Sequence, residues 1–178
     1  MGKEKCLYLI GFMGTGKSSI GSLLAEKLKY IFIDTDSIIE ESEGMTINEI
    51  FRTKGEASFR EMEKRLLKNL TEEYNSKGFV MSTGGGMPCN HENLNYMKQN
   101  GKVIYIKSNI DDIIKRVKES EARPIIHRLE KTGDMKEGLE ALLKKREYYY
   151  MQADITVTNT KGDDADDIVK RIQDQVSE

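Results

Sequence analysis

The sequence predicts a single α/β domain in which a parallel sheet carries helices on both faces. Two observations lead to this prediction. Short apolar segments that fit buried strands alternate, along the whole chain, with longer segments whose apolar residues recur at helical spacing. Five strand segments occur, at residues 7–10, 30–33, 79–82, 102–106 and 154–157. Because helices separate them, we expect parallel strands with their carboxyl ends at one edge.

The first strand runs into a glycine-rich stretch, residues 11–18, that matches the spacing G-x-x-x-x-G-K-[ST] of a phosphate-binding P-loop. Ile20, Leu24 and Leu28 follow as one face of a helix. The glycines let backbone amides point at a polyphosphate from the positive end of the helix dipole. Lys17 would add a charge on the phosphates. A ligand-free glycine turn is the alternative, and the complete motif disfavours it.

Two carboxylates, Asp34 and Asp36, follow the second strand. Open parallel sheets bind ligands at this edge, so both would lie beside the P-loop if the first two strands are close together. If strand geometry persists, the two side chains point in alternating directions and could serve a metal and a substrate hydroxyl. The alternative is that one of them only caps the helix that begins near Ser37.

The next segments are helical. Gly44 is expected to end the helix after Asp36, and Thr46 with Glu49 forms a capping box for a short helix over residues 49–51. A further helix begins at about Glu56 and has an apolar stripe, formed by Phe59, Met62, Leu66, Leu67 and Leu70. Arg60 lies on this helix, where an isolated arginine would usually be a solvated surface charge.

Three consecutive glycines, Gly84, Gly85 and Gly86, follow the third strand. Each costs roughly 0.5–1 kcal/mol relative to alanine in regular structure, so close approach of a ligand to the backbone would explain them. A plain flexible turn is the alternative.

The second half of the chain continues the alternation. A helix is expected over residues 110–119, opened by Ser108 or Asn109, and others over 139–150 and 163–176. Between the first two, residues 120–138 are charged and weakly periodic, which favours a mobile lid.

Composition excludes several classes of function. The chain has a net charge of −2 with its basic residues dispersed, which argues against nucleic-acid binding. Cys6, Cys89, His91 and His127 have no zinc-like spacing. No stretch of 18 apolar residues occurs, so we expect a cytoplasmic protein without a membrane partner.

Five motifs in order give the sequence a resemblance to the shikimate kinase family; they lie at residues 11–18, 32–36, 55–63, 82–86 and 123–126. This resemblance covers nearly the whole chain. It implies a nucleoside-monophosphate-kinase-like P-loop fold and transfer of the γ-phosphoryl group of ATP to the 3-hydroxyl of shikimate, in the biosynthesis of chorismate and aromatic amino acids. It also implies a substrate-binding segment at about 35–75, a lid at about 120–138, and a monomer.

The resemblance also implies site residues. Those expected at ATP are Gly14, Thr15, Gly16, Lys17, Ser18, Ser19 and Arg123. Those expected at shikimate are Asp36, Arg60, Gly84, Gly85, Gly86 and Arg146. Ser18 would be a ligand of Mg²⁺, with Asp34 acting on the metal through water. Lys17, Asp36 and the lid residue Arg123 would carry the chemistry, and Arg60 and Arg146 would grip the substrate carboxylate.

The sequence departs from the family pattern in two places. Tyr148 occupies a position that is often proline, so Lys145 competes with Arg146 as the second carboxylate ligand. Residues 158–162 lack the proline often found near adenine. A gluconate or nucleoside monophosphate kinase remains an alternative, as does a binding module without catalysis, although the intact Lys17 and Asp36 argue against the latter.

Overall fold

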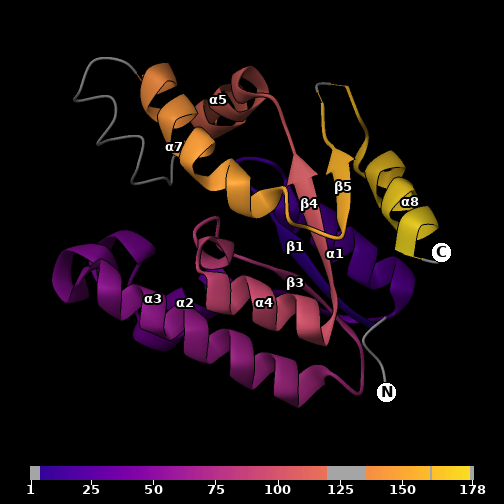
Figure 1. Ribbon diagram of the computed structural model, residues 1–178, viewed down its shortest axis with the longest axis horizontal. Coiled ribbons are helices and arrows are strands. Elements are labelled where there is room, and N and C mark those ends of the chain that lie inside the picture. Colours follow the sequence, from indigo (N-terminus) through magenta and orange to yellow (C-terminus); the bar gives the residue numbers. More distant parts are fainter. Residues whose placement is uncertain (1–4, 120–134, 161, 177–178) are drawn as a thin grey trace.

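The computed structural model describes residues 5–119, 135–160 and 162–176 (Figure 1). At its centre lies a sheet of five strands, all paired in parallel, in the order β2-β3-β1-β4-β5. The strands are β1 (Cys6–Ile10), β2 (Ile31–Asp34), β3 (Phe79–Ser82), β4 (Lys102–Lys107) and β5 (Ile155–Thr158). The predicted parallel sheet is therefore confirmed.

Helices separate the strands along the chain. They are α1 (Lys17–Leu28), α2 (Thr35–Glu43), α3 (Ile47–Tyr74), α4 (His91–Asn100), α5 (Ile110–Glu119), α7 (Met135–Tyr150) and α8 (Ala165–Val176), with a short 3-10 helix η2 (Met87–Cys89). The two helices predicted after Gly44 run end to end as α3, interrupted at Gly55 by non-helical backbone (φ 81°, ψ 165°). The capping box of Thr46 and Glu49 opens α3 as expected.

Two elements, η2 and α4, were not predicted. The Asn90 side-chain oxygen caps α4 by accepting a hydrogen bond from the Glu92 backbone N–H at 2.8 Å. Leu94 and Met97 are the buried apolar residues of this helix. A capping residue followed by two apolar residues three positions apart is a short signal, but it was present in the sequence.

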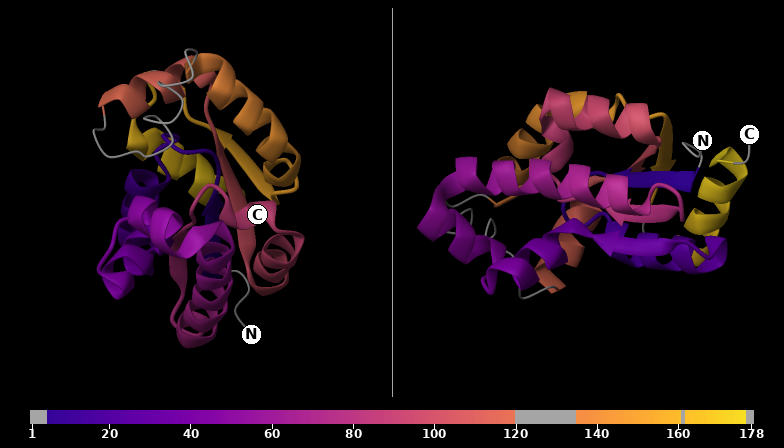
Figure 2. Two further views of the ribbon diagram at one scale, coloured as in Figure 1. Left: turned by 90° about the vertical axis from the view of Figure 1, so that its left-hand side faces the viewer. Right: turned by 90° about the horizontal axis from the view of Figure 1, so that it is seen from below.

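The sheet divides the core into two layers. Tyr8 and Ile10 of β1 face a cluster that includes residues of α3, α4 and α7, whereas Leu7 and Leu9 face a cluster with α1 and α8. This alternation follows from the two-residue period of a strand. Helices α4 and α1 accordingly lie on opposite sides of the sheet in the view from below (Figure 2, right).

The order of the strands in the sheet decides how the P-loop after β1 lies relative to Asp34 at the end of β2. Because β3 lies between β1 and β2, the P-loop and Asp34 are not on adjacent strands. Ser82 at the end of β3 pairs in register with both Leu9 and Asp34. The end of β3 therefore lies between the strand that precedes the P-loop and the strand that ends at Asp34.

Gly101, between α4 and β4, provides a test of packing in this fold. A Cβ at this position would lie 2.1 Å from the carbonyl oxygen of Cys6, which is backbone and cannot swing away. We expect Gly101→Ala to lower the free energy of unfolding by about 3 kcal/mol, at the upper end of the cost of overpacking. Urea denaturation would measure the loss.

Gly44→Ala is the matched control, because nothing lies within 4 Å of a Cβ there and only the positive φ of 62° is strained. Its expected cost is about 1 kcal/mol. Equal losses for the two variants would contradict the packing argument.

Candidate active site

The glycine-rich loop between β1 and α1 lies at the carboxyl edge of the sheet. Gly14 and Gly16 have positive φ angles of 74° and 87°, which glycine adopts without steric cost. The Lys17 ammonium donates to the carbonyl oxygens of Gly11 at 3.0 Å and Phe12 at 2.9 Å. The buried Thr15 hydroxyl also donates within the loop, to the Phe12 carbonyl oxygen at 2.8 Å.

Helix α1 begins unlike its neighbours. It has no side-chain cap and no acidic residue in its first turn, whereas side chains of Asp34, Thr46 and Asn90 cap α2, α3 and α4. A helix N-terminus whose dipole is not offset by a capping or acidic side chain, and which follows a glycine-rich loop, is suited to binding an anion. The loop geometry therefore fits the phosphate-binding role that the motif predicts.

Distant segments brace this loop. The Asn159 side-chain amide, just after β5, donates to the Thr15 carbonyl oxygen at 2.9 Å. Arg116 of α5 donates to the Asn159 side-chain oxygen at 3.0 Å and to the Ser108 hydroxyl at 3.2 Å. No sequence motif pointed to a bracing role for Arg116 or Asn159, because that role arises only when β4 pairs with β1 and β5 pairs with β4.

A cluster of oxygen atoms lies next to the loop. The Ser18 hydroxyl donates to Asp34 Oδ2 at 2.6 Å and lies 3.5 Å from the Ser82 hydroxyl. Asp34 Oδ1 accepts from the Ser37 backbone N–H at 3.2 Å and so caps α2. Asp34 is therefore the cap of α2, one of the alternatives that the sequence left open, and its other oxygen bonds to Ser18 of the P-loop.

Asp36 is positioned differently from expectation. The strand ends at Asp34, so Asp36 lies in the first turn of α2. The expectation of alternating directions was wrong, because the strand does not continue and because side chains two residues apart on a strand share a face. Its Oδ1 atom is buried and lies 2.5 Å from the position that a Cβ on Gly84 would occupy. The geometry of a helix start, rather than a strand, brings this carboxylate to the glycine run.

Each of the three glycines faces a different charged side chain. A Cβ on Gly84 would meet Asp36 Oδ1, one on Gly85 would lie 3.3 Å from Arg146 Nη1, and one on Gly86 would lie 2.4 Å from Arg60 Nη1. A side chain at Gly84 or Gly86 would displace those groups, and one at Gly85 would crowd Arg146. The run is thus a surface against which charged groups converge, rather than a plain flexible turn.

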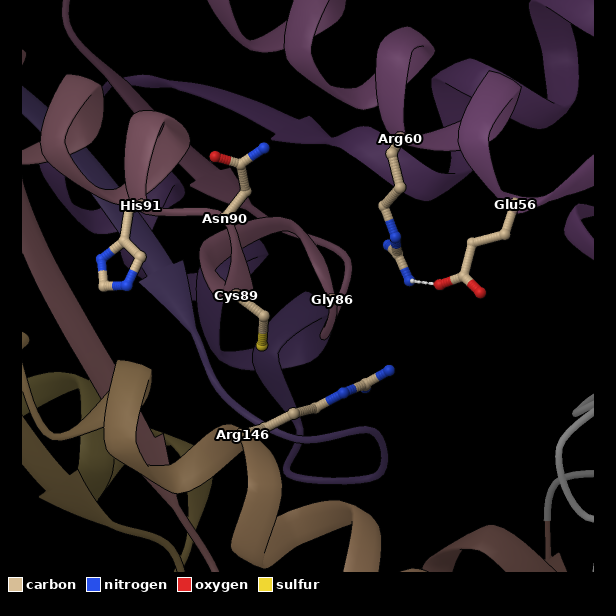
Figure 3. A pocket seen from close by; sticks show the side chains of 7 residues that line it. All are labelled: Glu56, Arg60, Gly86, Cys89, Asn90, His91 and Arg146. Atoms are coloured by element: carbon tan, nitrogen blue, oxygen red, sulfur yellow. Dashed lines mark hydrogen bonds and ion pairs between the residues drawn. The ribbon is translucent and has the colours of Figure 1, made fainter.

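The two arginines point into one cavity of about 560 Å³ (Figure 3). Its lining consists of Glu56, Arg60, Gly86, Cys89, Asn90, His91 and Arg146. Arg60 and Arg146 reach toward each other from α3 and α7, on opposite walls. Lys145, the alternative to Arg146, is exposed instead. Two guanidinium groups in one cavity suit a carboxylate ligand.

Arg60 is held by acidic side chains of its own helix. Its Nη1 donates to Glu63 Oε2 at 2.6 Å, and its Nη2 donates to Glu56 Oε1 at 3.1 Å. Its guanidinium also lies 5.4 Å from the centre of the Phe59 ring and 5.8 Å from that of Phe51. The expected solvated surface charge is therefore a fixed, half-buried group.

Glu63 is a site residue that sequence reasoning missed. Its side chain is 1% exposed, and its second oxygen, Oε1, has no hydrogen-bond partner among the described residues. Burial raises the pKa of Glu63 to about 7, against the opposing charge and hydrogen bond of Arg60, and the Asp36 carboxylate raises it further. A signal existed, because Glu63 occupies a position of the buried stripe, four residues from both Phe59 and Leu67.

Two expectations fall partly outside the described residues. Arg123 and residues 120–134 of the expected lid are not described. The last residues of that stretch, 135–138, form the first turn of α7.

Glu63 predicts a pH-dependent stability. Its pKa is about 7 in the fold against an ordinary value of 4.5, so between these values the folded state binds more protons than the unfolded state. Stability contributed by this group is therefore present at low pH and lost as the pH rises through 7. Relative to Glu63→Gln, we expect the wild type to lose on the order of 3 kcal/mol between pH 4.5 and pH 8.

Urea unfolding across this range would measure the difference. Glu61→Gln, an exposed change on the same helix, is the control and should preserve the wild-type profile. Parallel stability profiles for the wild type and Glu63→Gln would contradict the prediction.

Comparisons with known proteins agree with this geometry. A family model described as Shikimate kinase matches residues 13–177. A shikimate kinase of Persephonella marina is 42% identical over 166 residues, which cover 93% of this chain and 95% of that protein.

Solved structures extend the similarity to the fold. The crystal structure of shikimate kinase from Aquifex aeolicus has a TM-score of 0.81 and 37% identity, covering 97% of this chain and 96% of that one. Shikimate kinase from Acinetobacter baumannii, solved in complex with shikimate, has a TM-score of 0.86 and 32% identity, covering 97% and 93%. Because the family model matches residues 13–177 and the relatives match more than nine-tenths of the chain, the chain belongs to the shikimate kinase family.

Proposed function

We propose that this chain is a shikimate kinase, which transfers the γ-phosphoryl group of ATP to the 3-hydroxyl of shikimate and yields shikimate 3-phosphate and ADP. The main support is one juxtaposition. The position of a Cβ on Gly85 is 3.3 Å from the Gly11 carbonyl oxygen of the P-loop and 3.3 Å from Arg146 Nη1. A phosphoryl donor on the loop and a carboxylate-bearing acceptor in the two-arginine cavity would meet across this glycine.

The acceptor's orientation follows from its charge. Arg60 and Arg146 would bind the carboxylate with planar, bidentate groups, and the glycine backbone would lie against the ring. Asp36, near Gly84, would accept the hydrogen bond of the attacking hydroxyl and orient it toward the phosphate. The carboxylate and the reacting hydroxyl would then be held by different elements, which fixes the direction of the ring.

The transferring group needs charge stabilisation more than covalent chemistry. Amides of residues 14–19 and the Lys17 ammonium would bind the phosphates, and Arg123 would approach the γ-phosphoryl from the lid at 120–138. A charge supplied by a closing segment would complete the site only after the acceptor binds and so limit the hydrolysis of ATP.

Mg²⁺ fits the oxygen cluster at Ser18. We propose that Ser18 binds the ion directly and Asp34 through water. In the described part of the chain, no group of three or more His, Cys, Asp or Glu side chains could hold a metal. This agrees with Mg²⁺, which keeps several waters and phosphate oxygens and needs few protein ligands. When bound, the ion would neutralise phosphate charge.

The proposal includes the organisation of the chain. Residues 1–178 form one kinase domain, with a substrate-binding segment at about 35–75, and act as a cytoplasmic monomer in aromatic amino-acid biosynthesis. Its partners would be ATP and shikimate, without nucleic acid or membrane. None of the helices in the described ranges is long and apolar enough to cross a bilayer.

Release of ADP tests the acceptor directly. We expect shikimate to stimulate ADP release from MgATP by the purified chain, because its carboxylate and hydroxyl suit the arginines and Asp36 and its ring suits the glycine run. Gluconate and nucleoside monophosphates serve as competing acceptors. Stimulation by gluconate in place of shikimate would overturn the assignment and favour a sister kinase, while nucleotide binding without any turnover would favour a silent binding module.

Arg60→Ala should mainly weaken shikimate binding. Loss of one partner of a buried charge pair costs about 2–5 kcal/mol, so we expect a large increase in the KM for shikimate and a KM for ATP close to that of the wild type. Arg65→Ala, an exposed change on the same helix, should leave both constants unchanged. A normal KM for shikimate in Arg60→Ala would remove Arg60 from the site.

A further inference from the structure

Tyr150 is the last residue of α7 and lies one helical turn after Arg146. Its side chain is 0% exposed, and its ring packs against that of Tyr105 on β4, with centroids 5.2 Å apart. Packing thus fixes the ring. A buried phenol requires hydrogen-bond partners, and those of Tyr150 belong to the proposed site.

The Tyr150 hydroxyl joins α7 to the glycine run. It donates to the Gly85 carbonyl oxygen at 2.6 Å. Arg146, one turn earlier on the same helix, reaches the same glycine, because a Cβ on Gly85 would lie 3.3 Å from its Nη1. Burial raises the pKa of Tyr150, against the nearby charge and hydrogen-bonding capacity of Arg146, so the group remains a neutral hydroxyl. Tyr150 and Arg146 therefore meet at Gly85.

The two arginines of the cavity are held by different chemistry. Arg60 lies between two carboxylates, whereas Arg146 has a neutral hydroxyl on one side and the Phe12 ring 5.8 Å from its guanidinium carbon. A neutral anchor fixes the guanidinium without cancelling its charge. Arg146 can then retain its full attraction for an incoming carboxylate.

The hydrogen bond from Tyr150 to the Gly85 carbonyl oxygen affects the geometry of the site. The Gly85 carbonyl otherwise accepts only the weak Cys89 thiol contact, at 3.7 Å, among the interactions seen in the described residues. The same residue separates Arg146 from the P-loop carbonyl of Gly11. Loss of the hydroxyl would release both the arginine and the loop that lies between donor and acceptor.

We propose that Tyr150 is a positioning residue for the acceptor: its hydroxyl fixes Arg146 relative to the Gly85 carbonyl and thereby sets the geometry of the carboxylate site. This inference rests on the proposed function. Tyr150 itself does not touch the reacting groups. It acts through Arg146, so its effect should depend on the presence of that arginine.

Tyr150→Phe tests the role, because it keeps the ring and removes only the hydroxyl. We expect the KM for shikimate to rise roughly tenfold, the loss expected for a hydrogen bond to a charged group. The KM for ATP should change less than about twofold, because the P-loop retains its braces at Asn159. Steady-state kinetics with each substrate varied in turn would measure this split.

Tyr8→Phe is the matched control. Tyr8 is also 0% exposed and belongs to the same core cluster, but its hydroxyl bonds to the Thr71 hydroxyl at 2.9 Å, away from the cavity. We expect it to lower the melting temperature without raising the KM for shikimate. If Tyr150→Phe behaves like Tyr8→Phe, the hydroxyl has a structural role only and the proposal is overturned.

A double-mutant cycle tests the route through Arg146. In an Arg146→Gln background, Tyr150→Phe should raise the KM for shikimate by less than about twofold, because the group it positions is absent. Full additivity of the two changes would overturn the proposal. Turnover by the wild type distinguishes a failure of the proposed function from a failure of this inference. If the wild type is inactive with shikimate, both are overturned. If the wild type is active and Tyr150→Phe has an unchanged KM for shikimate, only this inference is overturned.

Discussion

The arrangement depends on the absence of side chains at three consecutive positions after β3. Four charged groups from three helices, Asp36, Glu63, Arg60 and Arg146, approach the backbone of this run closely enough that a Cβ would meet them. Unlike charges can converge there without clashing because only backbone lies between them. The conformational entropy cost of the glycines is offset by this convergence rather than by any regular structure.

Burial gives these charges unequal surroundings. Glu63 is enclosed to the point that its pKa approaches neutrality, although it bonds to Arg60. A buried ion pair of this kind contributes little net stability, because desolvation opposes the attraction. Its value lies in holding the Arg60 guanidinium in one direction. Arg146 has no ion pair with a carboxylate among the described residues, whereas Arg60 has two. The cavity therefore presents one arginine whose charge is largely compensated and one whose charge is less so.

The phosphate loop depends on a second set of contacts, from the other edge of the sheet. Asn159 after β5 and Arg116 of α5 fix the Thr15 carbonyl through side-chain hydrogen bonds. These residues are distant from the loop in sequence: Arg116 is 102 positions after Gly14, and Asn159 is 144 positions after Thr15. The loop is therefore braced by the last strand, while the acceptor cavity is built by α3, η2 and α7. The phosphate loop and the acceptor cavity therefore lie together at the carboxyl ends of the strands, although different elements support them.

The local sequence pattern was sufficient to predict most of the strands and helices that carry the site residues. The P-loop, Asp34, the glycine run and Arg60 are each followed or preceded by a strand or helix whose periodicity is visible in the sequence, so their elements could be predicted. Where the local signal was short, prediction failed: η2 and α4 were missed, although they supply Cys89, Asn90 and His91 to the cavity.

What the sequence by itself determined was the five strands in their order along the chain, the parallel sheet and the chemical types gathered at its carboxyl edge. The tertiary structure alone decided which groups meet. It placed β3 between β1 and β2, put Asp36 in the first turn of α2, and brought Arg146, but not the exposed Lys145, into the lining of the cavity. It also buried Glu63 and joined the Tyr150 hydroxyl to Gly85, 65 positions away. Periodicity reports the face on which a residue lies, but not the partner that a distant segment brings to that face.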